Sequence, residues 1–167
     1  MLRQIRTSRA FSVALLLTAS VAIAACSKKP KPDAIGLGAG QGQATPGSVQ
    51  DFSLNVGDRV LFETDSSQIS AEGRTILDRQ AQWLNQYGTY SFTLEGHADE
   101  RGTREYNIAL GARRANAAKN YLISRGVSAG RIRTISFGKE RPVAVCNDIS
   151  CWSQNRRSVT VLDGPTS

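Results

Sequence analysis

The sequence predicts an α+β domain in which helices cover one face of a β-sheet, with the element order β-α-β-α-β-β. Four segments after residue 50 are typical of strands, and the clearest of them alternate apolar and polar side chains. Two longer segments between them repeat apolar residues at helical spacing. No glycine-rich phosphate loop follows the first strand, which argues against a doubly wound nucleotide-binding fold.

The first half of the domain contains two strands around one helix. A strand is expected at residues 59–63, because an apolar run there ends at the polar run 64–68. Ser70 is placed to cap a helix whose apolar residues recur at helical spacing until Gly88. Residues 90–95 then alternate in polarity, which predicts a strand with one buried face.

The second half supplies the remaining elements. A helix is expected from about residue 103 to residue 124. Strands are expected at 132–137 and at 158–162, and the segment between them is expected to be a loop that holds two cysteines.

The first 25 residues predict a signal peptide, because basic residues precede an apolar run that ends in small side chains. The run is too short to be typical of a permanent membrane span. The four residues that end at Cys26 resemble the lipobox of bacterial lipoproteins, so we expect Cys26 to receive a lipid anchor. The alternative is ordinary cleavage near Ala25, which leaves a free thiol.

Residues 26–50 contain few large apolar side chains, so we expect a lipidated N-terminus followed by a flexible linker. Residues 51–167 are then long enough for one domain with its own core. The formal charge of +7 includes three arginines of the signal, which leaves +4 after cleavage. Three lysines beside Cys26 suit anionic lipid. The basic charge therefore does not require nucleic acid as a partner.

The two remaining cysteines, Cys146 and Cys151, predict a local structural disulfide in an exported protein. A redox or metal site is the alternative. Four residues separate the two cysteines, which does not match the spacing of common redox or metal motifs.

An acid and an arginine are directed toward one place by two neighbouring elements. Asp99 lies in the loop that feeds the second helix, where Asn107, Leu110 and Arg114 share one face. A guanidinium binds a carboxylate through two parallel hydrogen bonds, and a carboxylate binds an ammonium group. The arrangement therefore suits a small zwitterion. Periodicity does not distinguish Arg114 from Arg113, and pairing of Asp99 with Arg114 or with neighbouring residues is the alternative.

The run GHADERGTREYNIALGARRANAAKNYL, residues 96–122, resembles the signature of the OmpA-like peptidoglycan-binding domain family. The similarity extends over residues 59–162 and includes GVSAGRI, the run 136–142 and the Asn-Arg-Arg at 155–157. This resemblance implies an α/β sandwich with a four-stranded mixed sheet. With the lipobox and linker in front, the chain resembles the lipid-anchored members of the family.

The resemblance also implies a ligand. Members of this family hold the stem peptide of peptidoglycan non-covalently by diaminopimelate, whose side-chain end carries an ammonium and a carboxylate. Carried over position by position, the resemblance selects Arg114 over Arg113. Family members often have a phenylalanine where this chain has Thr64. The implied pocket residues are Asp65, Asp99, Asn107, Leu110 and Arg114.

The resemblance further implies a lipoprotein of the outer membrane with its domain in the periplasm. It would tether that membrane to the cell wall as part of the Tol-Pal system, in envelope integrity and cell division. The implied protein partners are the periplasmic β-propeller protein of the Tol system and other Tol components. Ser27, which follows the lipidated cysteine, fits sorting to the outer membrane.

An enzyme acting on peptidoglycan is a second hypothesis. It would need a nucleophile or a metal-bound water, and the sequence shows no serine-histidine-acid set and no histidine pair. His97, the only histidine, is expected to support the loop after its strand, and Tyr106 is expected to pack. We therefore expect no catalytic residue, no metal and no cofactor. A flagellar stator or a porin is a third hypothesis, but the segment before residue 59 fits neither a retained membrane helix nor a large barrel.

Overall fold

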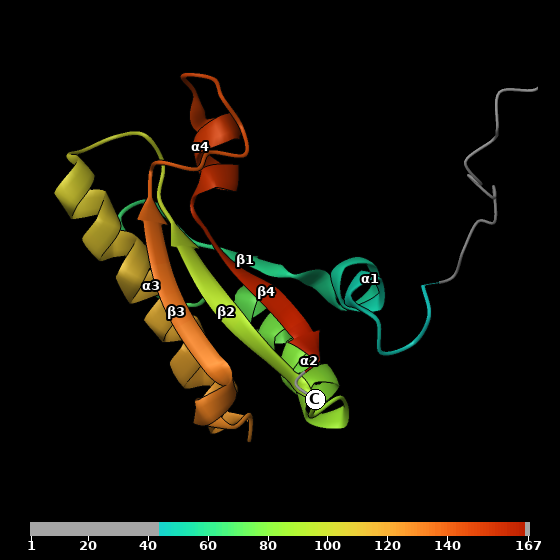
Figure 1. Ribbon diagram of the computed structural model, residues 1–167. Coiled ribbons are helices and arrows are strands. Elements are labelled where there is room, and N and C mark those ends of the chain that lie inside the picture. The colour runs from blue at the N-terminus through green and yellow to red at the C-terminus, as the bar shows by residue number, and fades with distance from the viewer. Residues whose placement is uncertain (1–43, 166–167) are drawn as a thin grey trace, which may run out of the picture. The chain divides into compact units, whose positions relative to one another are not determined.

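A computed structural model describes residues 44–165 (Figure 1). Four strands form one mixed sheet in the order β1-β4-β2-β3. β2 and β3 are parallel, whereas β4 is antiparallel to both β1 and β2. The strands are β1 (Arg59–Leu61), β2 (Tyr90–His97), β3 (Ile132–Gly138) and β4 (Arg157–Pro165). The predicted α+β class and four-stranded mixed sheet are confirmed.

Two long helices, α2 (Ala71–Gln86) and α3 (Arg104–Ser124), pack on one face of this sheet, as expected (Figure 1). The Ser70 hydroxyl accepts a hydrogen bond from the Gly73 amide at 3.0 Å, which is the predicted cap of α2. The shorter helical segments are α1 (Val49–Asp51), η1 (Phe52–Gly57), η2 (Ala129–Arg131) and α4 (Ile149–Asn155).

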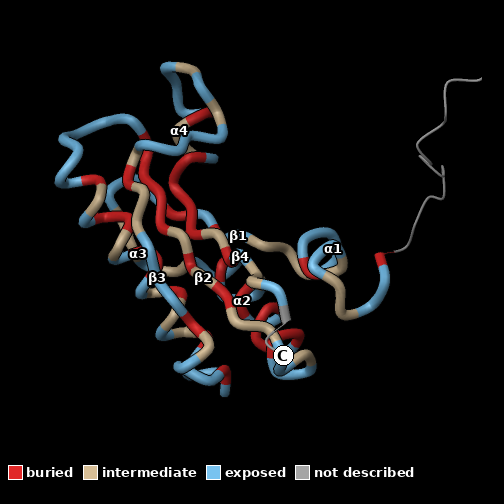
Figure 2. The backbone as a smooth tube through the Cα atoms, in the orientation of Figure 1, coloured by how far each residue is buried: buried red, intermediate tan, exposed pale blue. Residues whose placement is uncertain are grey.

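The core lies between the helices and the sheet face that they cover (Figure 2). In β2, Phe92 and Leu94 are fully buried, while Thr93 and Glu95 on the opposite face are only partly buried. Leu84 and Leu122 lie in the same apolar cluster from the helix side. The alternation in the sequence therefore correctly identified the buried face.

Two glycines bring α3 unusually close to β2. A Cβ atom built on Gly96 would lie 1.8 Å from the carbonyl oxygen of Gly111, so neither strand nor helix leaves room for a side chain there. This contact fixes the first half of α3 beside the end of β2. The loop that follows β2 and the inner face of α3 therefore meet.

The segment between β3 and β4 differs from the predicted loop, because it contains the helix α4. The Asp148 carboxylate caps this helix by accepting a hydrogen bond from the Ser150 amide at 2.7 Å. Cys146 and Cys151 form a disulfide, as predicted, which joins α4 to the preceding turn. So short a helix lacks the apolar periodicity that reveals a longer one.

Residues 44–50, which the sequence analysis placed in the linker, pack against the folded domain. The Tyr90 hydroxyl donates to the Gly47 carbonyl at 2.9 Å, and Ala44 is buried. The contacts come mainly from backbone groups and from aromatic side chains elsewhere in the chain, so the segment itself carries little sequence signal. The predicted signal peptide, Cys26 and the rest of the linker lie outside the described residues.

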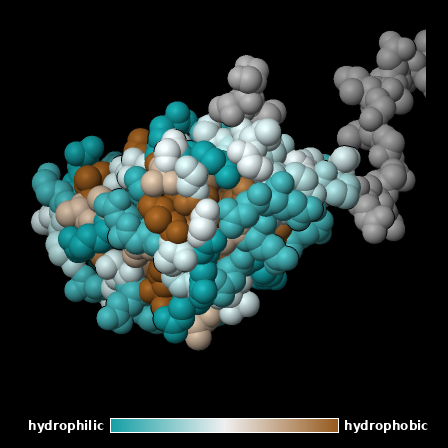
Figure 3. Space-filling model, turned by 90° about the horizontal axis from the view of Figure 1, so that it is seen from below, coloured by the Kyte–Doolittle hydropathy of each residue, from teal (hydrophilic) through white to brown (hydrophobic). Residues whose placement is uncertain are grey.

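Polar side chains cover most of the face seen in Figure 3, and apolar side chains form separate patches between them. In the described part of the chain, no helix is long and apolar enough to cross a membrane.

Candidate ligand-binding site

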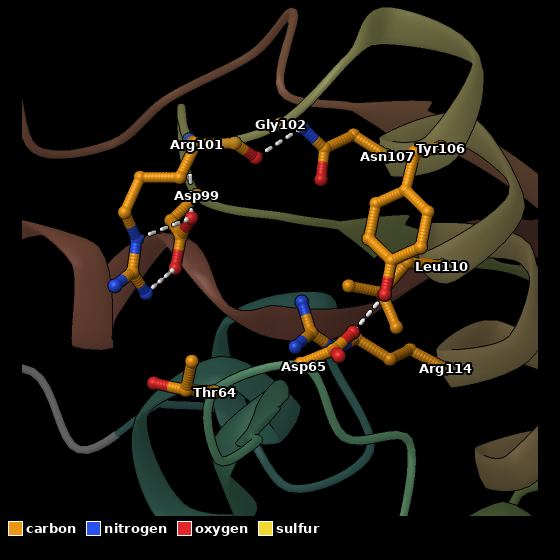
Figure 4. Close-up of a pocket in the computed structure, with 9 residues that line it drawn as sticks. All are labelled: Thr64, Asp65, Asp99, Arg101, Gly102, Tyr106, Asn107, Leu110 and Arg114. Carbon is orange, nitrogen blue, oxygen red and sulfur yellow. Dashed lines mark hydrogen bonds and ion pairs between the residues drawn. The ribbon is translucent and has the colours of Figure 1, made fainter.

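A pocket of about 300 Å³ opens where the turn after β1, the loop after β2 and the first half of α3 meet (Figure 4). All five residues that the family resemblance implied for the pocket line it, and Arg113 does not. Figure 4 shows their side chains converging from the three segments. The lining residues are Thr64, Asp65, Asp99, Arg101, Gly102, Tyr106, Asn107, Leu110 and Arg114.

Arg114 is fully buried and is held rigidly by backbone carbonyls. Its Nε donates to Ser66 at 2.8 Å, its Nη1 to His97 at 2.8 Å and its Nη2 to Glu63 at 3.1 Å. A guanidinium has five N–H groups, so two have no acceptor among residues 44–165. These two groups remain available for a carboxylate.

Burial, and next the nearby charge of Arg156, lower the pKa of Arg114 to about 10. The guanidinium therefore stays charged at neutral pH. Its neighbour Arg113 is exposed and lies beside the ring of Tyr106. The structure thus separates the two arginines that helical periodicity could not distinguish.

Asp99 is nearly buried, with 7% of its surface exposed, and it pairs with arginines other than Arg114. Its carboxylate accepts from Arg101 Nη2 at 2.7 Å and from Arg156 Nη1 at 3.4 Å. Burial acts to raise the pKa of Asp99, but the hydrogen bonds from Arg101 and Arg156 outweigh it and hold the pKa below its ordinary value. The pocket therefore contains an ionised carboxylate opposite a fixed guanidinium.

Asp65 supplies a second carboxylate from the turn after β1. Its backbone is left-handed, with φ of 54°. The hydroxyl of Tyr106 hydrogen-bonds its Oδ1 (Figure 4). Tyr106 thus also lines the pocket, a position that the sequence did not indicate. Thr64 forms the adjoining wall and is exposed.

Asn107 and Leu110 complete the inner face of α3. The Asn107 amide donates to the Arg101 carbonyl at 2.8 Å, so it supports the loop after β2. Leu110 is 5% exposed and provides the apolar part of the lining.

His97 ends β2, as expected, and its backbone carbonyl accepts a hydrogen bond from Arg114. Its ring is buried beside Phe137. Burial, with contributions from Arg157 and Arg141, lowers the pKa of His97 to about 4. The ring is therefore neutral at physiological pH.

Sequence reasoning did not select Arg101 or Arg156 as individual site residues. Arg156 contacts Asp99 although the two lie 57 positions apart, so no local pattern predicts the pair. Arg101 follows Asp99 by two positions, and its amide and side chain both return to that carboxylate. An aspartate often accepts a hydrogen bond from the backbone two positions later, so the sequence could have suggested this pair.

Comparison with known proteins agrees with this architecture. The model of the OmpA family matches residues 61–156. The chain belongs to the OmpA family. Among curated members, it is 68% identical over 124 residues to the peptidoglycan-associated lipoprotein of Mesorhizobium japonicum, covering 74% of each chain. It is 48% identical over 115 residues to that of Pseudomonas aeruginosa, covering 68% of each.

Solved structures of other proteins have the same fold. The peptidoglycan-associated lipoprotein of Burkholderia pseudomallei superposes with a TM-score of 0.62 at 38% identity, over 64% of this chain and 90% of that one. The C-terminal domain of Helicobacter pylori MotB gives a TM-score of 0.61 at 21% identity, over 65% of this chain and 86% of that one, and that likeness concerns the fold alone.

Proposed function

We propose that this chain is a non-catalytic lipoprotein that binds peptidoglycan through the diaminopimelate of its stem peptide. The observation that carries the proposal is the pocket, in which a rigid guanidinium and two carboxylates face one small space. The side-chain end of diaminopimelate has the complementary charges, an ammonium and a carboxylate. The similar proteins are named peptidoglycan-associated lipoproteins, which supports peptidoglycan as the partner.

In this proposal each residue has a separate role. Arg114 binds the ligand's carboxylate with its two remaining N–H groups, which are already oriented because the other three are engaged. Asp99 and Asp65 bind the ammonium group. Leu110 contacts the aliphatic chain, and Asn107 holds the loop that carries Asp99.

We further propose that Cys26 carries the lipid and that the following linker lets the domain reach the cell wall. The chain would then tether the outer membrane to peptidoglycan from the periplasmic side, as a component of the Tol-Pal system in envelope integrity and cell division. Its protein partners would be the periplasmic β-propeller protein and other Tol components. The similar proteins are named as lipoproteins rather than enzymes, so we expect no release of muropeptides on incubation with peptidoglycan.

The test is co-sedimentation of the full chain with purified peptidoglycan. Asp99→Ala should abolish binding, because the ligand's ammonium loses its buried counter-charge and keeps only the exposed Asp65. Arg114→Lys keeps a charge but loses the two-pronged geometry, so binding should fall by at least about tenfold. Arg113→Lys makes the same exchange outside the pocket and should bind like the unchanged protein.

Thermal unfolding of each variant shows whether the fold is retained. If folded Asp99→Ala and folded Arg114→Lys both sediment with peptidoglycan as well as Arg113→Lys does, this pocket is not the binding site.

A further inference from the structure

The carboxylate of Asp99 is already surrounded by hydrogen-bond donors. Oδ1 accepts from the amide and from the Nε of Arg101, each at 3.2 Å. Oδ2 accepts from Arg101 Nη2 at 2.7 Å and from Arg156 Nη1 at 3.4 Å. An ionised carboxylate offers about four lone-pair positions, so these donors occupy them all. A ligand's ammonium group can bind Asp99 only if one donor moves away.

Arg101 is the donor that can move. The side chain of Arg156 is 6% exposed, and its Nε also donates to the Phe62 carbonyl at 2.9 Å. The side chain of Arg101 is 42% exposed, and Asp99 is its only side-chain hydrogen-bond acceptor within residues 44–165. Displacing the Arg101 side chain therefore breaks side-chain hydrogen bonds to one residue and needs no change in the core.

The loop backbone is held separately from the Arg101 side chain. Lys139 Nζ donates to the carbonyls of Glu100 and Gly102 at 3.1 and 2.7 Å, and Asn107 donates to the carbonyl of Arg101. The side chain can leave Asp99 while its backbone stays in place.

Trp152 of α4 defines where the Arg101 side chain lies. The guanidinium carbon of Arg101 is 4.3 Å from the centre of the Trp152 ring, within the range of a cation–π contact. Trp152 Nε1 donates to Glu100 Oε1 at 3.0 Å, which fixes the ring beside the loop. The disulfide next to Trp152 restricts this segment further.

We propose that Arg101 competes with the ligand for Asp99. The Arg101 guanidinium occupies the carboxylate oxygens that the ligand's ammonium binds, and it is displaced when the ligand binds. The inference rests on the proposed function, in which Asp99 binds that ammonium. The apparent affinity is then reduced by the fraction of molecules in which Arg101 covers Asp99. Arg101 thereby sets how tightly the pocket holds its ligand.

The test uses the full chain in detergent, with meso-diaminopimelate as the probe and calorimetric titration as the measurement. Arg101→Gln removes the competitor and should tighten binding about three- to tenfold, the range that a partly exposed ion pair of this kind supports. Arg104→Gln is the matched control, because Arg104 pairs with the exposed Glu140 at 3.2 Å and does not line the pocket. It should leave the affinity within about twofold. Binding by Arg101→Gln that is equal to or weaker than that of Arg104→Gln overturns the proposal.

A second measurement needs no ligand. Carbon-13 NMR titration of the Asp99 carboxyl should show a higher pKa in Arg101→Gln than in Arg104→Gln. Burial raises this pKa, and without the Arg101 guanidinium fewer hydrogen bonds lower it. An equal pKa in both variants contradicts the Arg101 contact.

The two hypotheses fail in different ways. If Asp99→Ala binds diaminopimelate normally, the proposed function is wrong. If Asp99→Ala abolishes binding but Arg101→Gln does not tighten it, only the competitor role is wrong.

Discussion

Replacing Arg114 with methionine should destabilise the fold, because this side chain connects three segments. Its guanidinium reaches carbonyls of Glu63, Ser66 and His97, which belong to the turn after β1 and to the end of β2. Methionine fills a similar volume without donors, so three carbonyls lose the Arg114 donor, and that of His97 loses it in a buried place. These contacts lie within the protein, so their effect on stability can be measured without ligand.

The expected magnitude follows from these contacts. A hydrogen bond from a charged donor contributes about 1.5–3 kcal/mol, so three bonds give a gross contribution of about 5–9 kcal/mol. The cost of burying the guanidinium, which also lowers its pKa to about 10, offsets a large part of this. We expect a net loss of about 3 kcal/mol in the free energy of unfolding, in the range found when one side of a buried polar contact is removed.

Urea unfolding followed by tryptophan fluorescence measures this loss, since Trp83 is buried in the core. Arg113→Met is the control for the same exchange at an exposed position and should change stability by less than about 0.5 kcal/mol. A difference below about 1 kcal/mol between the two variants would refute the argument that Arg114 joins the three segments.

Three further predictions concern packing, the disulfide and pH. Gly96→Ala should cost more than about 3 kcal/mol or prevent folding, because its Cβ meets the Gly111 carbonyl, whereas Gly88→Ala, with no atom within 4 Å, should have little effect in the same urea assay. Replacing Cys146 and Cys151 by serine should lower the free energy of unfolding by about 2 kcal/mol, the chain-entropy value for so short a loop. Dithiothreitol should then lower the urea midpoint of the protein that has both cysteines and leave that of the serine variant unchanged. Because the folded pKa of His97 is about 4 and its ordinary value is 6.5, the unfolded chain takes up this proton first as the pH falls. Stability should therefore decline from about pH 6.5 to pH 4 by up to about 1.4 kcal/mol per pH unit, and His97→Gln should flatten that part of the curve; equal slopes would contradict a neutral buried ring.

Local patterns predicted the main helices and strands, because alternation and helix caps each depend on only a few neighbouring residues. Alternation located the buried face of β2, and the cap at Ser70 located the start of α2. The helix α4 was missed because a capping carboxylate, a disulfide and contacts to other segments hold it, rather than an apolar stripe. Residues 44–50 were assigned to the linker because the aromatic groups they contact belong to other segments.

The candidate site divides in the same way. Helical spacing placed Asn107, Leu110 and Arg114 on one face of α3, and the structure has all three lining one pocket. Periodicity could not choose between Arg113 and Arg114, because adjacent residues differ by only about 100° around a helix. The close contact between Gly96 and Gly111 makes that choice, since it sets which side of α3 faces β2.

The sequence by itself determined the strands, the two long helices, the disulfide and the residue types that suit a small zwitterion. Only the tertiary structure decided which distant groups pair with those charges. Asp99 bonds to Arg101 and Arg156 rather than to Arg114, and Asp65 bonds to Tyr106 from a distant turn. The physical reason is the strand order: β4 lies between β1 and β2, so Arg156, just before β4, reaches Asp99, just after β2. No local pattern contains that adjacency, because it arises when the sheet forms.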